Sequence, residues 1–260
     1  MVTLLMLSGI FYLFAHRYYW RNSSERFDNG PGFELISHRG LKSAAPENTI
    51  EAILAAVDLG FRWVELDVMT TSDRAIVCSH NFDLERETDS FGYLHQSSLK
   101  DIKHAYTGVS KDYIGAYRIP ELKTILKKIP NHIGINIEIK SSSMFDLRTA
   151  RALLSLKNIL EVRPVIISSF NPLVLAYLHL FLRAAPTGFL LESKKYLWIT
   201  NWLHPDYLHL RGDMLTESIV SLCKKRNMKI NAWTVNNKRA IKFLFNKQVV
   251  GVVTDIGAVI

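Results

Sequence analysis

The fold of this chain depends on Trp63–His80, which reads W-V-E-L-D-V-M-T-T-S-D-R-A-I-V-C-S-H. Two runs rich in apolar and β-branched residues, Trp63–Val68 and Ala75–Ser79, flank a turn-like cluster, so the stretch predicts a β-hairpin. In the first run, Glu65 and Asp67 stand two residues apart, which places both carboxylates on one face of a strand. Burying two like charges side by side is costly unless a cation lies between them.

The register of this hairpin determines which side chains meet. A tip near Ser72–Asp73 would place Glu65 opposite His80 and Asp67 opposite Cys78. Two carboxylates and an imidazole would then lie within reach of one another. The alternative is an amphipathic hairpin with one solvated face, and this stretch alone fits both.

The composition fits one large domain with a short additional segment. The chain has 260 residues, of which 48% are hydrophobic, which is ample for a single core. Its two cysteines, Cys78 and Cys223, provide no disulfide framework, and no paired Cys/His spacing indicates zinc. The net charge of +8 suits an anionic partner. Most of the excess lies in helix-like segments without a nucleic-acid-binding motif, so we interpret it as a solvated face and expect no nucleic-acid partner.

The first part of the chain differs from the rest. Residues 1–15 are almost wholly apolar, and the next six read H-R-Y-Y-W-R. Neither a basic n-region nor an A-x-A-like cleavage site indicates a secretory signal. We therefore predict a membrane tether at residues 1–21, with the folded domain on the cytoplasmic side because the positive flank follows the apolar run. The alternative is a hydrophobic first helix of the fold. Residues 22–32 are polar and contain Gly and Pro, as in a linker.

Strand-like and helix-like runs alternate from Phe33 onward, which argues for a parallel sheet. Removing the return strand of the hairpin, which must be antiparallel, leaves eight strand candidates. No G-x-G-x-x-G follows the first strand, so a dinucleotide-binding layer is disfavoured. We predict an α/β fold, a TIM-type (β/α)8 barrel over residues 33–260. The nine strand candidates are Phe33–Ser37, Trp63–Val68, Ala75–Ser79, Ile133–Ile139, Val165–Ser168, Thr187–Leu191, Tyr207–Leu210, Lys229–Val235 and Val249–Thr254.

Helical patterns and one long irregular segment fill the intervals between these strands. Glu85–Arg118 is polar, aromatic and weakly periodic, too long for a plain loop, so we expect an insertion beside a site. The predicted helices are Glu47–Leu59, Pro120–Ile129, Ser143–Leu160, Pro172–Arg183, Thr216–Arg226 and Lys238–Phe245.

Polar residues gather where the predicted strands end, which is the catalytic face of such a barrel. Three carboxylates suit a hard cation such as Mg²⁺ or Ca²⁺. An arginine and a lysine suit phosphate oxygens, and two histidines suit acid/base work near neutral pH. Together these groups describe phosphodiester cleavage. They are His38, Arg39, Glu65, Asp67, His80, Glu138 and Lys140.

Several motifs in this order resemble the glycerophosphodiester phosphodiesterase family. They cover nearly all of residues 33–257 and read H-R-G-(x5)-P-E-N-T from His38, E-L-D-V from Glu65, S-H at Ser79, E-I-K from Glu138, S-S-F from Ser168, W-T-V-N from Trp233 and V-T-D from Val253.

The resemblance implies a role for each matching residue. It implies one divalent ion held by Glu65, Asp67 and Glu138, and acid/base work by His38 and His80. It also implies phosphate contacts from Arg39 and Lys140, with Glu47, Asn48 and Trp233 supporting the site. The segment Glu85–Arg118 matches the insertion of the family.

One position departs from the family pattern. Members commonly carry Asp after the second histidine, whereas this chain has Asn81. If the Asp only fixes the loop, the Asn81 amide can do so. If it orients the imidazole, His80 loses a charged partner.

The resulting functional expectation is metal-dependent hydrolysis of glycerophosphodiesters or lysophospholipids, giving glycerol 3-phosphate or a lysophosphatidic acid and an alcohol. The aromatic segment Tyr196–Trp202 follows a strand end and could lie on the rim of the barrel mouth, which favours lysophospholipids; a buried connecting helix is the alternative. A different class of function is a membrane-anchored barrel that binds phosphodiester head groups without catalysis.

Overall fold

A closed ring of eight parallel strands forms the centre of the protein, as the sequence predicts. The computed structural model describes residues 2–22, 33–109, 117–182 and 185–257. The strands pair in the order β1-β9-β8-β7-β6-β5-β4-β2, and β1 also pairs with β2, which closes the barrel. The short strand β3 pairs antiparallel with β2 outside the ring. The strands are β1 (Glu34–His38), β2 (Trp63–Thr70), β3 (Ile76–Cys78), β4 (Gly134–Ile139), β5 (Val165–Ser169), β6 (Thr187–Leu191), β7 (Tyr207–Arg211), β8 (Lys229–Trp233) and β9 (Val249–Thr254).

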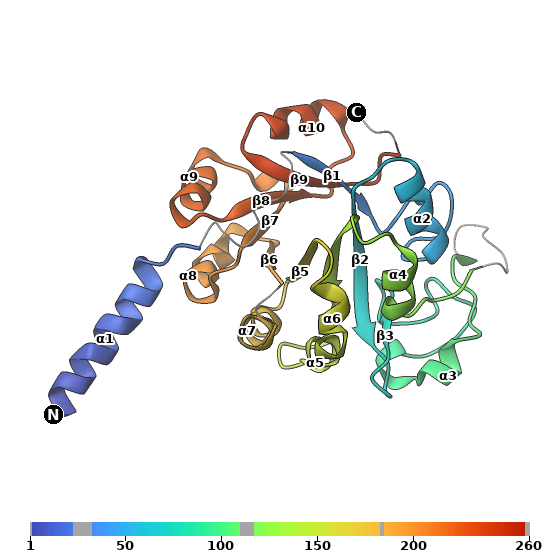
Figure 1. Ribbon diagram of the computed structural model, residues 1–260, viewed down its shortest axis with the longest axis horizontal. Helices are drawn as coiled ribbons and strands as arrows, with labels where there is room; N and C mark the ends of the chain where they lie inside the picture. Colours follow the sequence, from blue (N-terminus) through green and yellow to red (C-terminus); the bar gives the residue numbers. More distant parts are fainter. Residues whose placement is uncertain (1, 23–32, 110–116, 183–184, 258–260) are drawn as a thin grey trace.

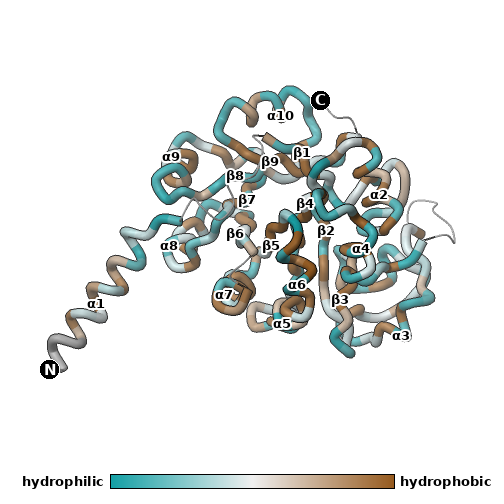
Figure 2. Tube along the Cα trace, in the orientation of Figure 1, coloured by the Kyte–Doolittle hydropathy of each residue, from teal (hydrophilic) through white to brown (hydrophobic). Residues whose placement is uncertain are grey.

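Helices surround the ring between successive strands (Figure 1). Apolar residues gather on the strands and on the sides of the helices that face them, as Figure 2 shows. The helices are α1 (Val2–Tyr18), α2 (Ile50–Asp58), α3 (Leu99–Ile102), α4 (Leu122–Lys128), α5 (Arg148–Leu153), α6 (Lys157–Leu160), α7 (Pro172–Phe181), α8 (Thr200–Leu203), α9 (Glu217–Arg226) and α10 (Lys238–Phe245). Short 3-10 turns occupy Leu94–Gln96, Leu154–Leu156, Lys194–Ile199 and Gly212–Met214.

The hairpin exists, but its predicted register is wrong by one residue. Val68 lies opposite Cys78, and Thr70 lies opposite Ile76. The turn contains a residue with left-handed backbone, Arg74 at φ 67°. A turn of this kind has an odd number of residues, whereas the prediction assumed a symmetric two-residue tip. Asp67 consequently lies beside Ser79 rather than opposite Cys78, since the Ser79 amide donates to the Asp67 carbonyl at 3.1 Å.

Two predicted helices also need correction. The helix predicted to begin at Glu47 begins at Ile50, because Asn48 has a left-handed backbone at φ 60° and Thr49 caps the helix by accepting a hydrogen bond from the Ala52 amide. The helix predicted over Ser143–Leu160 is divided into α5, a 3-10 turn and α6. Glu47 and Asn48 therefore precede α2, and their side chains lie at the barrel mouth.

The predicted insertion forms a small unit beside the barrel. Its apolar side chains, with Leu94 and Ile102 fully buried, pack against Met69 and Val77 of the hairpin. Residues 110–116 of the predicted segment lie outside the described residues. The unit therefore holds the hairpin, and with it the loop that carries His80, against the barrel.

The segment predicted as a tether forms helix α1, which projects away from the barrel (Figure 1). No helix in the described parts of the chain is both long enough and apolar enough to cross a bilayer. Of the predicted linker 22–32, only Asn22 lies within the described residues.

Several buried polar side chains of the strands lie inside the barrel. On neighbouring strands, Glu65 lies beside Asn136, and His209 lies beside Asn231, so the members of each pair share the inner face. Gly188 leaves the space for the His209 ring, because a Cβ there would lie 2.7 Å from its Nε2 atom. Burial lowers the pKa of His209 to about 3, so its ring is neutral. His209 and Asn231 are therefore polar but uncharged side chains inside the barrel.

Candidate active site

Three buried carboxylates from neighbouring strands form the centre of the site. Glu65 and Asp67 lie on β2, and Glu138 lies directly beside Asp67 on β4. One oxygen from each lies within 4.8 Å of the others, and no other such acidic, histidine or cysteine group occurs in the described residues. Glu65 is 3% exposed and Asp67 is 0% exposed. The sequence-predicted triad is thus assembled by the register of two adjacent parallel strands.

The protonation of these groups shows the cost of burying them together. Burial, and then the charges of Asp67 and Glu138, raise the pKa of Glu65 well above its usual value. Burial and Asp67 likewise raise the pKa of Glu138. Burial alone would raise the pKa of Asp67 as well, but Lys140 and Arg39 outweigh it and lower that pKa. The mutual repulsion of the three carboxylates therefore favours a further positive charge between them.

The donor set fits a divalent cation. Oxygen ligands from carboxylates are what Mg²⁺ and Ca²⁺ prefer. Oε1 of Glu65 is buried and has no hydrogen-bond partner among the described residues. A bound cation would satisfy this oxygen and offset the repulsion among the three carboxylates.

Two cations border the triad, as the sequence predicts. Nε of Arg39 lies 2.8 Å from Oδ2 of Asp67, and its Nη1 donates to Glu47 at 2.7 Å. Nζ of Lys140 lies 3.0 Å from Oδ1 of Asp67 and also contacts Glu138. Burial opposes both charges, but the surrounding carboxylates prevail and raise the pKa of Arg39 and of Lys140. Both side chains are therefore charged and lie where a phosphate could reach them.

The backbone after β1 turns sharply to place Arg39. Arg39 and Gly40 both have left-handed backbone, at φ 60° and 87°. A side chain at Gly40 would lie 2.6 Å from the backbone carbon of Ala52 in α2, so only glycine fits. The Arg39 amide then donates to Oε2 of Glu65 at 3.2 Å. The H-R-G motif thus has a steric reason for its glycine.

Asn48 supports the acidic strand from the side. Its Nδ2 donates to Oδ2 of Asp67 at 3.2 Å, and its Oδ1 accepts from the Asp67 amide at 3.0 Å. Glu47 holds Arg39, as described above. Glu47 and Asn48 therefore contact Arg39 and Asp67, two of the residues that the resemblance assigns to the site.

The first histidine is held by a carboxylate that sequence reasoning missed. Nδ1 of His38 lies 2.7 Å from Oδ1 of Asp255. Asp255 also contacts Lys42 and accepts from Nδ2 of Asn236 at 2.7 Å. Burial would raise the pKa of Asp255, but the hydrogen bonds from His38, Lys42 and Asn236 hold it well below its usual range. Asp255 and Asn236 lie in the V-T-D and W-T-V-N motifs, but neither motif indicates a contact with His38.

The second histidine has a neutral neighbour instead. Nδ1 of His80 lies 3.1 Å from Oδ1 of Asn81. Burial lowers the pKa of His80, the Asp67 charge opposes this shift, and the positive charges of Arg39 and Lys140 add to it. The departure from the family pattern at Asn81 thus leaves the two histidines with different supports.

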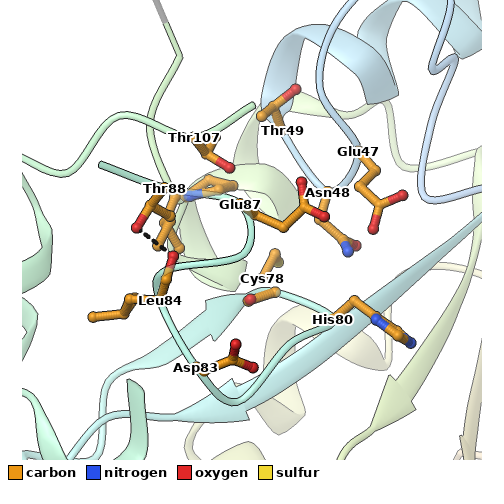
Figure 3. Close-up of a pocket in the computed structure, with 13 residues that line it drawn as sticks. Glu47, Asn48, Thr49, Cys78, His80, Asp83, Leu84, Glu87, Thr88 and Thr107 are labelled. Carbon is orange, nitrogen blue, oxygen red and sulfur yellow. Dashed lines mark hydrogen bonds between the residues drawn. The ribbon is translucent and has the colours of Figure 1, made fainter. Parts of the chain in front are cut away.

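A small pocket adjoins His80 on the side of the insertion. Figure 3 shows His80, Glu47 and Asn48 along it together with Asp83 and Glu87. Cys78 also lines the pocket but is 2% exposed, and burial raises the pKa of its thiol well above the usual value. The thiol is therefore neutral.

Trp233 forms an apolar wall at the mouth. Its ring packs edge-on against Phe170, with ring centres 5.5 Å apart, and its Nε1 donates to the His209 carbonyl at 3.1 Å. This hydrogen bond fixes the ring above the polar layer of the barrel. The site thus combines one apolar side with an acidic and cationic floor.

Comparisons with known proteins agree with this arrangement. A model described as the glycerophosphoryl diester phosphodiesterase family matches residues 38–256. The glycerophosphodiester phosphodiesterase of Caldanaerobacter subterraneus is 30% identical over 234 residues, which cover 85% of this chain and 93% of that protein. A counterpart from Bacillus subtilis is 26% identical over 246 residues, covering 85% of this chain and 82% of that one.

Solved structures show the same fold. A phosphodiesterase from Oleispira antarctica, in complex with the product sn-glycerol-3-phosphate, superimposes with a TM-score of 0.79 at 26% identity, covering 86% of this chain and 93% of that one. The glycerophosphodiester phosphodiesterase of Thermotoga maritima superimposes with a TM-score of 0.69 at 26% identity, covering 87% and 96%.

Proposed function

The chain belongs to the glycerophosphoryl diester phosphodiesterase family, and on this premise we propose that it hydrolyses glycerophosphodiesters to glycerol 3-phosphate and an alcohol with the help of a divalent cation. The observation that carries the proposal is the buried cluster of Glu65, Asp67 and Glu138. A bound divalent cation would act there as a Lewis acid and neutralise charge on a phosphate oxygen.

Arg39 and Lys140 bind the substrate phosphate in this proposal. Both are charged, and both now contact carboxylates of the triad. A phosphate diester brings negative charge to the same place, so each cation can keep a negative partner when substrate binds. Arg39 offers a planar fork and Lys140 a point charge, which together orient the phosphate.

We assign the proton transfers to the two histidines. Because its pKa is lowered, His80 is neutral at pH 7 and can accept the proton of the attacking hydroxyl. The bond from phosphorus to the alcohol oxygen then breaks, and His38 donates a proton to that oxygen. Asp255 holds Nδ1 of His38 at 2.7 Å, which leaves Nε2 for the substrate. The attacking hydroxyl is water or the neighbouring hydroxyl of glycerol; in the second case a cyclic phosphate forms, and water then adds to phosphorus and opens the ring to give glycerol 3-phosphate.

Choline release from glycerophosphocholine by the full chain tests this assignment. His38→Ala and His80→Ala should each lower turnover about 10²–10⁴-fold, the usual contribution of a positioned acid or base. His104→Ala is the matched control, because this histidine is exposed and lies in the insertion. A His38 or His80 variant that turns over like the control would remove that histidine from the mechanism. Binding of glycerophosphocholine without any turnover would instead support a non-catalytic barrel.

We further propose that lysophospholipids are substrates of the same site. The side chains of Tyr196 and Trp198, after β6, are 42% and 55% exposed, which contradicts a fully buried connecting helix. Aromatic side chains of this kind suit a lipid–water boundary. The measurement is kcat/KM for lysophosphatidylcholine against glycerophosphocholine. A large advantage of the deacylated substrate would refute this part alone.

A further inference from the structure

Helix α1 carries an apolar surface that no described part of the chain covers. Met6, Leu7, Ile10 and Phe11 are between 61% and 71% exposed. No charged residue occurs before Arg17. A helix that projects from the barrel with such side chains in water requires an apolar partner (Figure 1).

The C-terminal end of α1 is held against the barrel by several contacts. The chain after it buries Trp20, whose ring stacks on His204 with centres 4.3 Å apart. Nη1 of Arg226 donates to the carbonyls of Tyr18 and Trp20 at 2.8 and 2.9 Å. Asn22 donates from Nδ2 to the Pro205 carbonyl at 2.7 Å. The direction of α1 relative to the barrel is therefore set by contacts made on several elements.

The barrel exposes aromatic and basic side chains beside the C-terminal end of α1. In the turn Lys194–Ile199 and in α8, Leu197 and Ile199 pack toward the core, whereas Trp198 and Trp202 are 55% and 40% exposed. The Arg17 guanidinium lies 5.4 Å from the ring centre of Trp202, which joins α1 to this surface. We call the group the docking collar; it consists of Arg17, Tyr18, Lys195, Tyr196, Trp198 and Trp202.

The chemistry of α1 and the docking collar favours a lipid bilayer over a protein. A helix that binds a protein surface usually keeps a polar face, and residues 2–15 contain no charge on any face. Aromatic rings with basic side chains are typical of the membrane interface, and basic charges complement anionic lipid head groups. None of the six residues of the collar is acidic.

The length of α1 limits how deep it can reach. Its 17 residues span about 25 Å, which is less than the roughly 30 Å of a hydrocarbon core. We propose that α1 inserts from one side of an anionic bilayer without crossing it and that the docking collar lies in the head-group region. The barrel is then held on the membrane in one fixed orientation. This proposal does not rest on the catalytic one.

Flotation of the full chain with phosphatidylcholine vesicles, with and without phosphatidylglycerol, tests the proposal. Trp198→Ala should lower the partition coefficient about fivefold, since a half-buried aromatic side chain is lost from the interface. Lys195→Glu should lower it about tenfold, only with phosphatidylglycerol present. Phe145→Ala is the control, because Phe145 is 84% exposed on the loop after β4. Circular dichroism and thermal unfolding verify that every variant is folded.

Several results would overturn the proposal. A full chain that remains unbound to both kinds of vesicle would refute it, as would a Phe11→Asp variant that floats as well as the parent chain. Equal losses in Trp198→Ala and Phe145→Ala would refute the docking collar. If light scattering shows a defined oligomer and this oligomer does not bind vesicles, the partner of α1 is a second copy of the chain, which would overturn the proposal.

Discussion

The substitution Asn81→Asp tests whether the surroundings of His80 make it the base. The amide oxygen of Asn81 lies 3.1 Å from Nδ1 of the ring, so a carboxylate there would sit at nearly the same place. An amide accepts a hydrogen bond without adding charge. A carboxylate would stabilise the protonated ring by direct attraction and oppose the burial that now lowers the pKa of His80.

The magnitude follows from the distance. Two unit charges 3.1 Å apart attract by about 5 kcal/mol at an effective dielectric constant of 20, which is an upper limit. Solvent that reaches the ring reduces this attraction. A neighbouring group of opposite charge commonly changes the pKa of an ionisable side chain by about 1–3 units, which corresponds to a free energy of about 1.4–4 kcal/mol. We expect the pKa of His80 to rise by about 1–2.

The assay is the pH dependence of kcat/KM for glycerophosphocholine. A base must be unprotonated, so activity is lost as pH falls through its pKa, and a raised pKa moves this acidic limb to higher pH. Asn81→Asp should move the limb upward by about 1–2 pH units, whereas Asn81→Ala, which adds no charge, should not. An unchanged acidic limb in Asn81→Asp, or an equal movement in both variants, would refute the assignment of His80 as the base.

Three further substitutions test the supports of the site. Asp255→Asn should lower kcat about 10–100-fold with little change in KM, because Asp255 holds the ring of His38. Steady-state kinetics measure this loss, and the exposed control Asp213→Asn should not show it. Asn48→Ala should lower the free energy of unfolding by about 2–4 kcal/mol, through lost hydrogen bonds and left-handed strain at φ 60°. Asn48→Gly should lose less free energy of unfolding in urea than Asn48→Ala, because glycine adopts the left-handed backbone without strain. Equal losses in the two variants would show that backbone strain does not contribute. Cys78→Ala should leave kcat unchanged because its thiol is neutral, and a large loss of turnover in a folded variant would contradict this.

The sequence predicted the strands well because apolar, β-branched runs between polar ends have few alternatives. Thr187–Leu191 and Val249–Thr254 form strands with the predicted bounds. Once the strands of a closed parallel barrel are known, their polar ends must meet at one face. The convergence of Glu65, Asp67 and Glu138 followed from this rule and from their spacing.

What the sequence could not predict depends on single backbone conformations and on distant pairs. Left-handed backbone at Arg74 shifted the hairpin register, and the same conformation at Asn48 delayed the start of α2. Neither residue is glycine; Asn adopts left-handed backbone more often than most other residues, so Asn48 carries a weak local signal, whereas Arg74 carries none. The contact of His38 with Asp255 joins residues 217 positions apart, and it depends on β9 closing the ring beside β1.

The most direct test of the account is the dependence of choline release on a divalent cation held by the acidic triad. The full chain and its Glu65→Gln variant are assayed with glycerophosphocholine in excess EDTA and again after Mg²⁺ or Ca²⁺ is restored. The account predicts that the chelator abolishes release and that one of the two cations restores it in the full chain. Neither cation should restore it in Glu65→Gln, since Oε1 of Glu65 is a buried oxygen of the triad with no hydrogen-bond partner among the described residues. Full release in excess EDTA would contradict the central claim.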